Sequence, residues 1–312
     1  MGIEAASYDQ ANGIKADFSS IYTAPDPRDY YRVLFGLGYV IPEVAKSVFR
    51  GIVDTRAAAG RPLKVVDVGC SYGINAALLR HPVGLRQLVQ RYASPQMQSL
   101  SPDEVIALDR RYFASWPRLH DLTLVGQDTS AAAIDYATAV GLLDRGVSRN
   151  LEHERPGRAD LAALAGADLV ISTGCVGYVT STTFRRILEA QDGTAAPWVC
   201  NFVLRMFSYD TIGEELARFG LVTEKVPGAT FVQRRFHSRG EFEATIAALR
   251  AAGVDPAGKE SEGMLHAELY LSRPQEAVDA LPIGDLVSIT SGAAVPDGRR
   301  FVEVDGEPRL MH

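Results

Sequence analysis

The residues best suited to chemistry form one short stretch, VVDVGCSYGIN, at residues 65–75. Its apolar residues carry one acidic side chain, Asp67, and run into Gly69, which is followed by small residues and then Gly73. A strand that stops at a glycine turn and then starts a helix is the local structure of many nucleotide sites. The question is which ligand this turn accommodates.

Two nucleotide-binding patterns fit the turn poorly. A dinucleotide fingerprint requires G-x-G-x-x-G, but the register from Gly69 puts Ser71 at the middle glycine and Ile74 at the last. A pyrophosphate would therefore meet a Cβ where the backbone has to come closest. A phosphate-binding loop requires Gly-Lys-Ser/Thr, which the stretch lacks.

A ligand that carries an ammonium group and a carboxylate fits better. Asp67 can hydrogen-bond an amine, directly or through water and the amides of the turn. The backbone N–H groups from Gly69 through Cys70 and Ser71 to Gly73 can hold a carboxylate at the start of the helix. These features describe the amino-acid end of S-adenosylmethionine, which we predict as the cofactor.

The pattern D-x-G-C-x-x-G after an apolar strand resembles motif I of the class I, Rossmann-like S-adenosylmethionine-dependent methyltransferases of the small-molecule type. The resemblance covers roughly residues 40–275. It implies that Asp128, in LVGQD, grips the ribose hydroxyls, and that Asn150 and Leu151, in RNLE, contact the adenine. The alternative for Asp128 is a helix cap, a role that Thr129 and Ser130 can also fill.

The same resemblance implies that STGCVGYVT (172–180) faces the substrate. Thr173 is expected at the cofactor, as is Thr129, and Tyr178 is expected at the substrate. The sequence lacks the Asn-Pro-Pro-Tyr/Phe signature of amino-group methyltransferases that act on nucleic acids or on glutamine side chains. We therefore expect a small-molecule acceptor.

Three further residues are candidates for the chemistry of the acceptor. Tyr178, Tyr209 and His237 follow strands and could accept a proton if the acceptor must lose one. Arg205, in NFVLRMF, could anchor an anionic substrate, and its alternative is a surface charge.

The tyrosine-rich segment IYTAPDPRDYY precedes the first long helix. It is either an aromatic helix that packs on the sheet or a flap that closes over the cofactor. The flap would bring Tyr22 and Arg28 to the cofactor carboxylate.

The composition limits the classes of partner that the protein can bind. The 312 residues are 46% hydrophobic and 22% charged, and the net charge of −6 argues against a nucleic-acid surface. No apolar run approaches the roughly 20 residues of a membrane span. The three cysteines, Cys70, Cys175 and Cys200, match no zinc spacing and suit a reducing, cytoplasmic compartment, so no metal is expected. Small buried thiols are the favoured interpretation of all three.

The elements that must position these residues alternate between strand and helix from residue 63 onward. The expected strands are KVVDVG (64–69), LTLVGQD (122–128), SRNLEHE (148–154), DLVISTG (168–174), WVCNFVLRMF (198–207), ATFVQRRF (229–236) and LHAELYLSRP (265–274). This pattern predicts an α/β fold, a three-layer Rossmann-like sandwich with a mostly parallel seven-stranded sheet. The strand ends that carry the motifs would then share one edge.

Three segments fall outside the alternation. We expect a helical flap at residues 1–60 and a core at 61–274. The core holds an insertion at 81–121, in which SPDE is a capping box. The insertion explains why Asp128 follows Asp67 by 61 residues, where a fingerprint leads one to expect about 20. Residues 275–312 form a β extension, in which LVSIT and RRFVEV alternate like strands and VDGEP offers an Asp-Gly turn.

The predicted function is S-adenosylmethionine-dependent methyl transfer to a small metabolite, in a context of specialised metabolism. The flap and the insertion would close the acceptor pocket, and a homodimer is the candidate assembly. Two alternatives stay open: an NAD(P)-dependent oxidoreductase, and a methyltransferase-like subunit that binds or regulates without catalysis.

Overall fold

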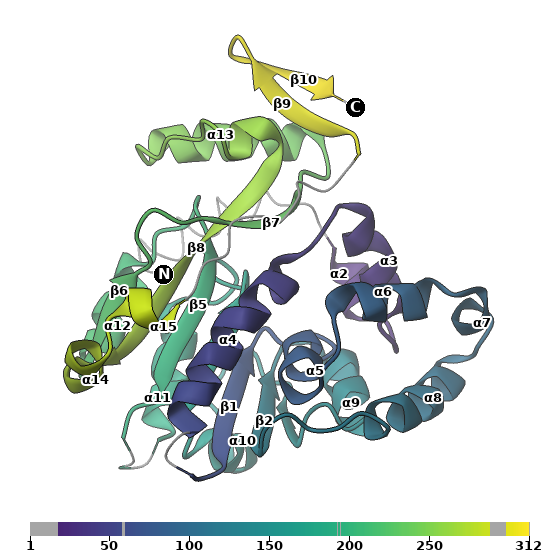
Figure 1. Cartoon of the computed structure of the whole chain (residues 1–312), viewed down its shortest axis with the longest axis vertical. Helices are drawn as coiled ribbons and strands as arrows, with labels where there is room; N and C mark the ends of the chain where they lie inside the picture. The colour runs from purple at the N-terminus through teal and green to yellow at the C-terminus, as the bar shows by residue number, and fades with distance from the viewer. Residues whose placement is uncertain (1–17, 58–59, 192, 194, 288–297, 312) are drawn as a thin grey trace.

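The computed structural model of the chain describes residues 18–57, 60–191, 193, 195–287 and 298–311. Eight strands form one sheet in the order β3-β2-β1-β4-β5-β8-β6, and β7 pairs with β8 outside this path (Figure 1). The strands are β1 (Leu63–Val68), β2 (Leu122–Gln127), β3 (Arg145–Val147), β4 (Leu169–Thr173), β5 (Trp198–Leu204), β6 (Leu221–Lys225), β7 (Phe231–Arg235) and β8 (Met264–Pro274).

Only β8 runs against the others. The pairs β1–β2, β1–β4, β2–β3 and β4–β5 are parallel, and β8 is antiparallel to β5, β6 and β7. The predicted mostly parallel, Rossmann-like sheet is confirmed. The strand order reverses between β1 and β4, and a crevice at the carboxyl ends beside such a switch point is the usual ligand site of this architecture.

Two details of the predicted sheet are wrong. The sheet has eight strands rather than seven, because residues 221–225 form β6, a short and half-exposed strand whose pattern is weak. The third strand is Arg145–Val147, and residues 148–154 form turns instead. This strand is three residues long and follows a glycine turn, so it carries almost no periodic signal.

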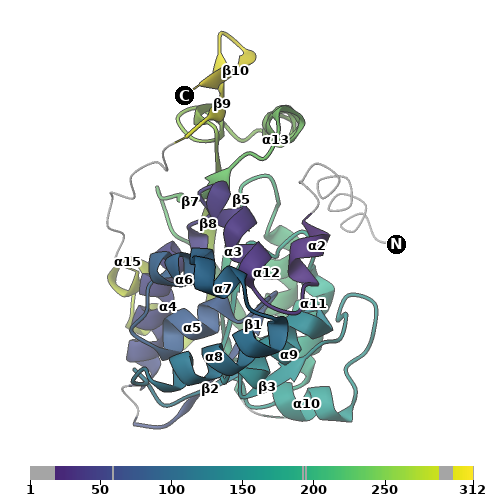
Figure 2. The same cartoon turned by 90° about the vertical axis from the view of Figure 1, so that its right-hand side faces the viewer.

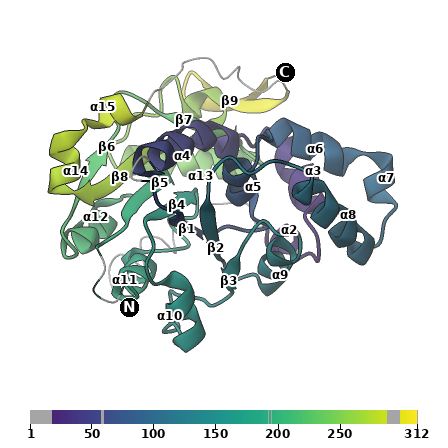
Figure 3. The same ribbon diagram turned by 60° about the horizontal axis from the view of Figure 1, so that its bottom comes forward.

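Alternate residues of each strand enter two separate hydrophobic cores. Val65 packs in one core and Val66 in the other. The first core is covered by helices α4 (Ile41–Ala57), α5 (Ile74–Arg80) and α9 (Ala131–Ala139), and the second by α10 (Arg158–Leu164), α11 (Ser181–Glu189), α12 (Asp210–Ala217) and α13 (Arg239–Ala251). Figure 3 shows α4 on one side of the sheet and α10 and α11 on the other. Strands buried on both faces explain the continuous apolar runs in the sequence.

The N-terminal helices and the inserted helices pack on each other beside the sheet. They are α2 (Ser19–Tyr22), α3 (Arg28–Gly36), α6 (Leu85–Ala93), α7 (Pro95–Gln98) and α8 (Pro102–Ala114). Tyr31 stacks on Tyr92 with ring centroids 4.5 Å apart. The Tyr92 and Tyr136 hydroxyls meet at 2.8 Å and both reach Asp109, which is fully buried. This cluster ties the insertion to α3 and α9.

The C-terminal part adds α14 (Gln275–Ala280), α15 (Ile283–Leu286) and a hairpin of β9 (Arg300–Val304) and β10 (Glu307–Met311). The hairpin lies beyond α13, away from the sheet (Figure 2). The expected Asp-Gly turn is confirmed, with positive φ at Asp305 and Gly306. The strand expected at LVSIT (286–290) falls mostly outside the described residues, and Leu286 ends α15.

Candidate functional site

Three residues of the turn between β1 and α5 have a left-handed backbone. Gly69 has φ +68°, Gly73 has φ +76°, and Ser71 between them has φ +47°. A Cβ on Gly69 would lie 2.6 Å from the Cβ of Cys175, closer than side chains can approach. Glycine is therefore required at residue 69, for its backbone conformation and for the close approach of β4.

Asp128 fastens this turn to the end of β2. The Ser71 N–H donates to Asp128 Oδ2 at 2.8 Å, and the Ser130 N–H donates to Oδ1 at 2.9 Å. Burial raises the pKa of Asp128, and the amides of Ser130, Ser71 and Thr129 oppose that shift. An ionised carboxylate offers about four acceptor positions, so these three amides leave about one open for a hydroxyl donor. Asp128 is thus both a local cap and a candidate hydroxyl ligand.

Asp67 lies behind Asn75 rather than in the cavity. The Asn75 amide donates to Asp67 Oδ1 at 3.0 Å and to Thr173 Oγ1 at 3.2 Å. Burial raises the pKa of Asp67 to about 7, although the hydrogen bond from Asn75 works against that rise. A ligand amine would therefore meet Asn75 first and feel the charge of Asp67 through it.

Four buried acceptor atoms lack a hydrogen-bond partner among the described residues. They are Asp67 Oδ2, Ser71 Oγ, Asn75 Oδ1 and Gln127 Oε1. Burying such a group unpaired costs about 1–3 kcal/mol. All four sit around the turn, which therefore suits a ligand rich in N–H and O–H donors, such as the amine and ribose of S-adenosylmethionine.

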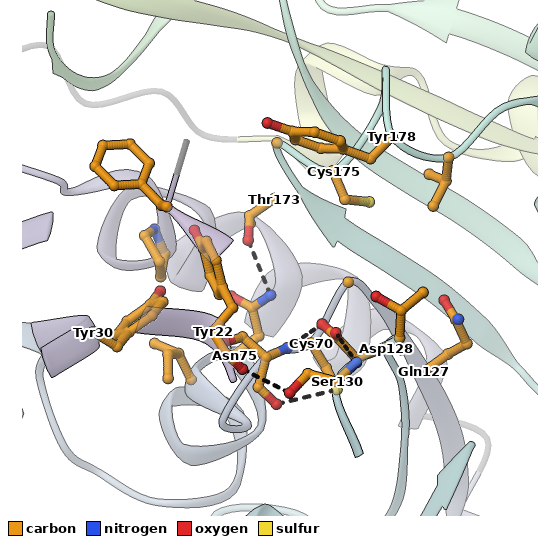
Figure 4. Close-up of a pocket in the computed structure, with 18 of the residues that line it drawn as sticks. Tyr22, Tyr30, Cys70, Asn75, Gln127, Asp128, Ser130, Thr173, Cys175 and Tyr178 are labelled. Atoms are coloured by element: carbon orange, nitrogen blue, oxygen red, sulfur yellow. Dashed lines mark hydrogen bonds between the residues drawn. The ribbon is translucent and has the colours of Figure 1, made fainter. Parts of the chain in front are cut away.

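A cavity of about 680 Å³ opens above the turn, at the carboxyl edge of the sheet. Figure 4 shows Tyr22 and Tyr30 on one side of it, Cys175 and Tyr178 on the other, and Asp128 and Ser130 below. This volume lies in the range of small-molecule sites.

Ten of the predicted cofactor and substrate residues line this cavity, namely Tyr22, Gly69, Cys70, Ser71, Asp128, Thr129, Asn150, Leu151, Thr173 and Tyr178. Tyr178 is 57% exposed, so it stands at the mouth. Gly73 lies directly behind the turn, where a Cβ would meet Ala137 at 3.1 Å.

The N-terminal segment forms the roof of the cavity. The Tyr72 hydroxyl reaches the carbonyl oxygens of Ile21 at 2.9 Å and Ala24 at 2.8 Å. The Ser130 hydroxyl donates to the carbonyl of Tyr22 at 2.6 Å. The glycine turn and the start of α9 thus both hold the segment in place.

Arg28 does not reach the cavity, contrary to the prediction. It pairs with Asp26 at 2.7 Å and donates to the carbonyls of Met97 at 2.9 Å and Leu100 at 2.7 Å. Its donors are thereby used to join the roof to the insertion. The insertion 81–121 itself contributes no lining residue among those described, so it braces the roof rather than closing the pocket directly.

Three other predicted residues also lie elsewhere. Arg205 is buried in an ion pair with Glu260 and donates to the carbonyl of Asp255, so its charge is already neutralised. Tyr209 is buried on α12's side of the sheet, where its hydroxyl accepts from Asn201 at 2.6 Å. His237 is not among the lining residues, and its ring contacts Phe18 edge-on with centroids 5.6 Å apart.

The sequence analysis missed several lining residues, namely Phe18, Tyr30, Tyr39, Asn75, Glu152, Gln233 and Arg234. Asn75 carried a usable signal, because it is the one polar residue at the start of an apolar helix. Gln233 and Arg234 are two adjacent polar residues in the strand ATFVQRRF, where alternation would allow only one to face inward.

Two of the three cysteines are buried, as the sequence predicts. Cys70 and Cys200 are buried and Cys175 is half-buried, and burial raises the pKa of the Cys70 thiol well above its usual range. Across the described ranges, no group of three or more His, Cys, Asp or Glu residues is placed to hold a metal ion. None of the helices in the described part of the chain is both long and apolar enough to cross a membrane.

The comparisons with known proteins give distant structural likenesses. No protein-family model matches the chain. No curated protein matches it in sequence. The plantazolicin methyltransferase BpumL in complex with a monoazolic desmethylPZN analog and SAH is similar in structure, with 13% identity, a TM-score of 0.40, and coverage of 88% of this chain and 100% of that chain.

A TehB-like SAM-dependent methyltransferase from Corynebacterium glutamicum is also similar, with 14% identity, a TM-score of 0.34, and coverage of 71% and 86% of the two chains. A functionally unknown protein from Deinococcus radiodurans R1 shows 15% identity, a TM-score of 0.37, and coverage of 74% and 85%. Likenesses this distant assign no family to the chain, whose fold is defined by its own strand order.

Proposed function

We propose that the chain is an S-adenosylmethionine-dependent methyltransferase that acts on a small molecule held in the same cavity. The observation that carries the proposal is the bond from the Ser71 amide to the Asp128 carboxylate. It joins the turn after β1 to the acidic end of β2, and it leaves an acceptor position of Asp128 open toward the cavity. The motif resemblance supports the same cofactor.

The same bond disfavours a dinucleotide. A pyrophosphate site uses the turn's N–H groups as anion donors. Here the central amide of the turn already serves an anion, Asp128, which is largely buried. A second anion at that place would be repelled in a medium of low dielectric constant. The NAD(P)-dependent alternative therefore loses its main requirement, and by the same argument the carboxylate of S-adenosylmethionine has to bind away from the Ser71 amide.

Three parts of the cofactor find a matching group. Asn75 Oδ1 would accept from the amine, with Asp67 supplying negative charge behind it. Asp128 would accept from a ribose hydroxyl. Gln127 and Leu151 line the cavity near the ends of β2 and β3, where an adenine would lie.

The turn amides expected to hold the carboxylate of the cofactor are already used. Gly69 and Cys70 donate to the Gln127 carbonyl, Gly73 donates to the Cys70 carbonyl, and Ser71 donates to Asp128.

The bound cofactor would supply a methyl group on a sulfonium centre, which is a good leaving group. The chain has to hold the acceptor in line with that methyl group and exclude water, and positioning of this kind can account for a large part of a rate enhancement. The rings of Tyr22 and Tyr30 present negative faces that suit a nearby cation. The described lining residues include no histidine or lysine, and Tyr178 is the predicted proton acceptor that lies among them. We propose Tyr178 as the base if the acceptor must lose a proton.

In this proposal residues 61–274 form the catalytic core, and the described residues 18–57 of the segment 1–60 form a flap over it. The roof from Phe18 to Thr23 limits the cavity to a volume that suits a small acceptor. The described parts of the segment 275–312, residues 275–287 and 298–311, form an extension outside the site.

Isothermal titration with S-adenosylhomocysteine tests the proposal. We expect micromolar affinity for the wild type and a loss of about tenfold to a hundredfold in Asp128→Ala, because buried hydroxyl contacts of about 1–3 kcal/mol disappear. Asp135→Ala is the matched control, since Asp135 is an exposed residue of α9. Binding of NAD without binding of S-adenosylhomocysteine would overturn the proposal. Cofactor binding without methyl transfer to any compound of a metabolite mixture would favour the non-catalytic alternative.

A further inference from the structure

Strand β7 carries a β-bulge beside the cavity. Val232 pairs with His266 and Arg234 pairs with Leu265, so Gln233 is an extra residue on its strand. In a regular strand, neighbouring side chains point to opposite faces. The bulge allows Gln233 and Arg234, which are 6% and 5% exposed, both to line the cavity. Bulges beside sites commonly re-aim a side chain in this way.

The Gln233 side chain is largely buried, but its amide reaches the cavity. Its Nε2 lies 2.3 Å from where a Cβ on Gly174 would be, so the missing side chain of Gly174 makes room for the amide. Gly174 follows β4 directly, at the loop that faces the acceptor end of the cavity. A side-chain amide at the cavity wall can donate to, or accept from, a polar ligand atom at this place.

Arg234 is adjacent to Gln233, and its positive charge is compensated by Glu241. Its guanidinium donates to Glu241 at 2.9 Å and 2.6 Å and to the carbonyl of Arg235 at 2.9 Å. A guanidinium has five N–H donors, so two remain. Its Cζ lies 5.2 Å from the ring centroid of Phe18, and Arg234 opposes the burial that raises the pKa of Tyr39 to about 12. Arg234 therefore lies among the aromatic residues of the roof.

The charges of Arg234 and Glu241 favour an uncharged ligand group at this place. A carboxylate at Arg234 would share one guanidinium with the buried Glu241, and two close carboxylates repel each other. An ammonium group would face Arg234 itself. An uncharged carbonyl oxygen can accept from Gln233 and Arg234 without either cost.

We infer that the methyl acceptor is an uncharged aromatic molecule that carries a carbonyl oxygen, as an amide, an ester or a conjugated ketone. Gln233 and Arg234 bind the carbonyl oxygen, and the rings of Phe18 and Tyr39 contact the aromatic part, with Tyr22 and Tyr30 between it and the methyl donor. This inference rests on the proposed function, because it assigns the other end of the cavity to the cofactor.

Three probes with the same aromatic ring and similar size test the inference on the full-length protein saturated with S-adenosylhomocysteine. They are 2-naphthamide, 2-naphthoate and 2-naphthylmethylammonium, each titrated by calorimetry. We expect the amide to bind about tenfold more tightly than either charged probe, which corresponds to one good hydrogen bond without a charge penalty. An equal or tighter affinity for naphthoate would overturn the inference, as would no binding of any probe.

Variants of Gln233 and Glu241 test which residues cause the preference for naphthamide. Gln233→Ala should lower the affinity for naphthamide about tenfold and leave that for S-adenosylhomocysteine unchanged, whereas Gln96→Ala, at an exposed position in α7, should change neither. Glu241→Gln should reverse the preference toward naphthoate, because Arg234 then keeps an uncompensated charge. Circular dichroism and the melting temperature show that each variant is folded.

An unchanged probe preference in a folded Glu241→Gln protein would overturn the charge argument. The first titration, with S-adenosylhomocysteine alone, separates the two proposals. If that ligand does not bind, the proposed function fails. If it binds and the probe preference is absent, only the inference fails.

Discussion

The two ends of the cavity are built in different ways. The polar end comes from two strand ends that are hydrogen-bonded neighbours, with the turn after β1 fastened to Asp128 after β2. The aromatic end comes from residues 18–42 and from the bulge at Gln233, which are far apart in the sequence. A motif can encode the first end, whereas the second depends on tertiary packing. The polar end should therefore respond to point changes more severely than the aromatic end.

The largest effect on cofactor affinity is expected at Gly69. Gly69→Ala adds a Cβ that would lie 2.6 Å from Cys175 Cβ, at φ +68°. A left-handed backbone costs about 1–2 kcal/mol for an ordinary residue, and overpacking adds about 1–3 kcal/mol. We expect a lower melting temperature and a loss of S-adenosylhomocysteine binding of more than about a hundredfold, since each 1.4 kcal/mol is a factor of ten.

Gly141→Ala is the matched control for Gly69. It has φ +82° and nothing within 4 Å of an added Cβ, so it carries the backbone strain without the clash. Its cofactor affinity should stay near that of the wild type. Equal losses in both variants would show that strain, not the approach of Cys175, governs the turn.

The next largest effect is expected at Asn75. Asn75→Ala removes the amide that separates Asp67 from the cavity, and with it the hydrogen bonds to Asp67 and Thr173. We expect affinity for S-adenosylhomocysteine to fall about tenfold in calorimetry, in line with about 1–3 kcal/mol for a buried hydrogen-bonded group. An unchanged affinity would show that the ligand amine does not bind at Asn75.

A smaller effect, dependent on pH, is expected from Asp67. Burial raises its pKa in the folded chain to about 7, above the ordinary value near 3.9. The folded state therefore holds a proton that the unfolded chain releases between about pH 4 and 7, and the contribution of Asp67 to stability falls as pH rises through that window.

A ligand ammonium favours the ionised carboxylate. The affinity for S-adenosylhomocysteine should thus rise several-fold from pH 6 to pH 8 and then level off. Asp67→Asn should remove this dependence in calorimetry at the two pH values. A wild-type affinity that stays flat across this range would exclude Asp67 as the source of charge.

At the boundary between the two ends, Tyr72→Phe should have a modest effect. The variant keeps the ring but loses the contacts to the carbonyls of Ile21 and Ala24, which are worth about 0.5–1.5 kcal/mol. We expect faster hydrogen exchange in residues 18–27 and a dissociation rate of S-adenosylhomocysteine about threefold to tenfold higher. Unchanged exchange in this segment would show that Tyr72 does not hold the roof.

The smallest effect on ligand binding is expected at Arg205. Arg205→Gln leaves Glu260 buried without its ion pair, so stability should fall by about 3–5 kcal/mol. Affinities for S-adenosylhomocysteine and for 2-naphthamide should not change, because Arg205 does not line the cavity. A selective loss of probe binding would restore Arg205 as a substrate residue.

The contrast between the two ends of the cavity also explains which site residues could be predicted from the sequence. The strand–turn–helix unit and Asp128 were predictable because short-range spacing fixes which residues meet at a parallel sheet edge. Asn75, adjacent to that motif, was visible in principle. Gln233 and Arg234 were not assigned, because a bulge reverses the facing that alternation predicts and only the pairing with β8 shows it.

Three of the predicted site residues that lie outside the cavity were chosen for the same reason. Arg205, Tyr209 and His237 follow strands in the sequence, and nearness to a strand end suggested the site. Each side chain instead finds a partner on β5, on η1 (Glu260–Glu262) or at Phe18. Such long-range partners are set by packing and carry no local sequence signal.

The most direct test of the account is a crystal structure with S-adenosylhomocysteine. We predict that one of its ribose hydroxyls lies within hydrogen-bond distance of the Asp128 carboxylate and that its amine faces Asn75. A ligand bound away from the turn after β1, or one whose hydroxyls do not reach Asp128, would contradict the assignment of this end of the cavity to the methyl donor.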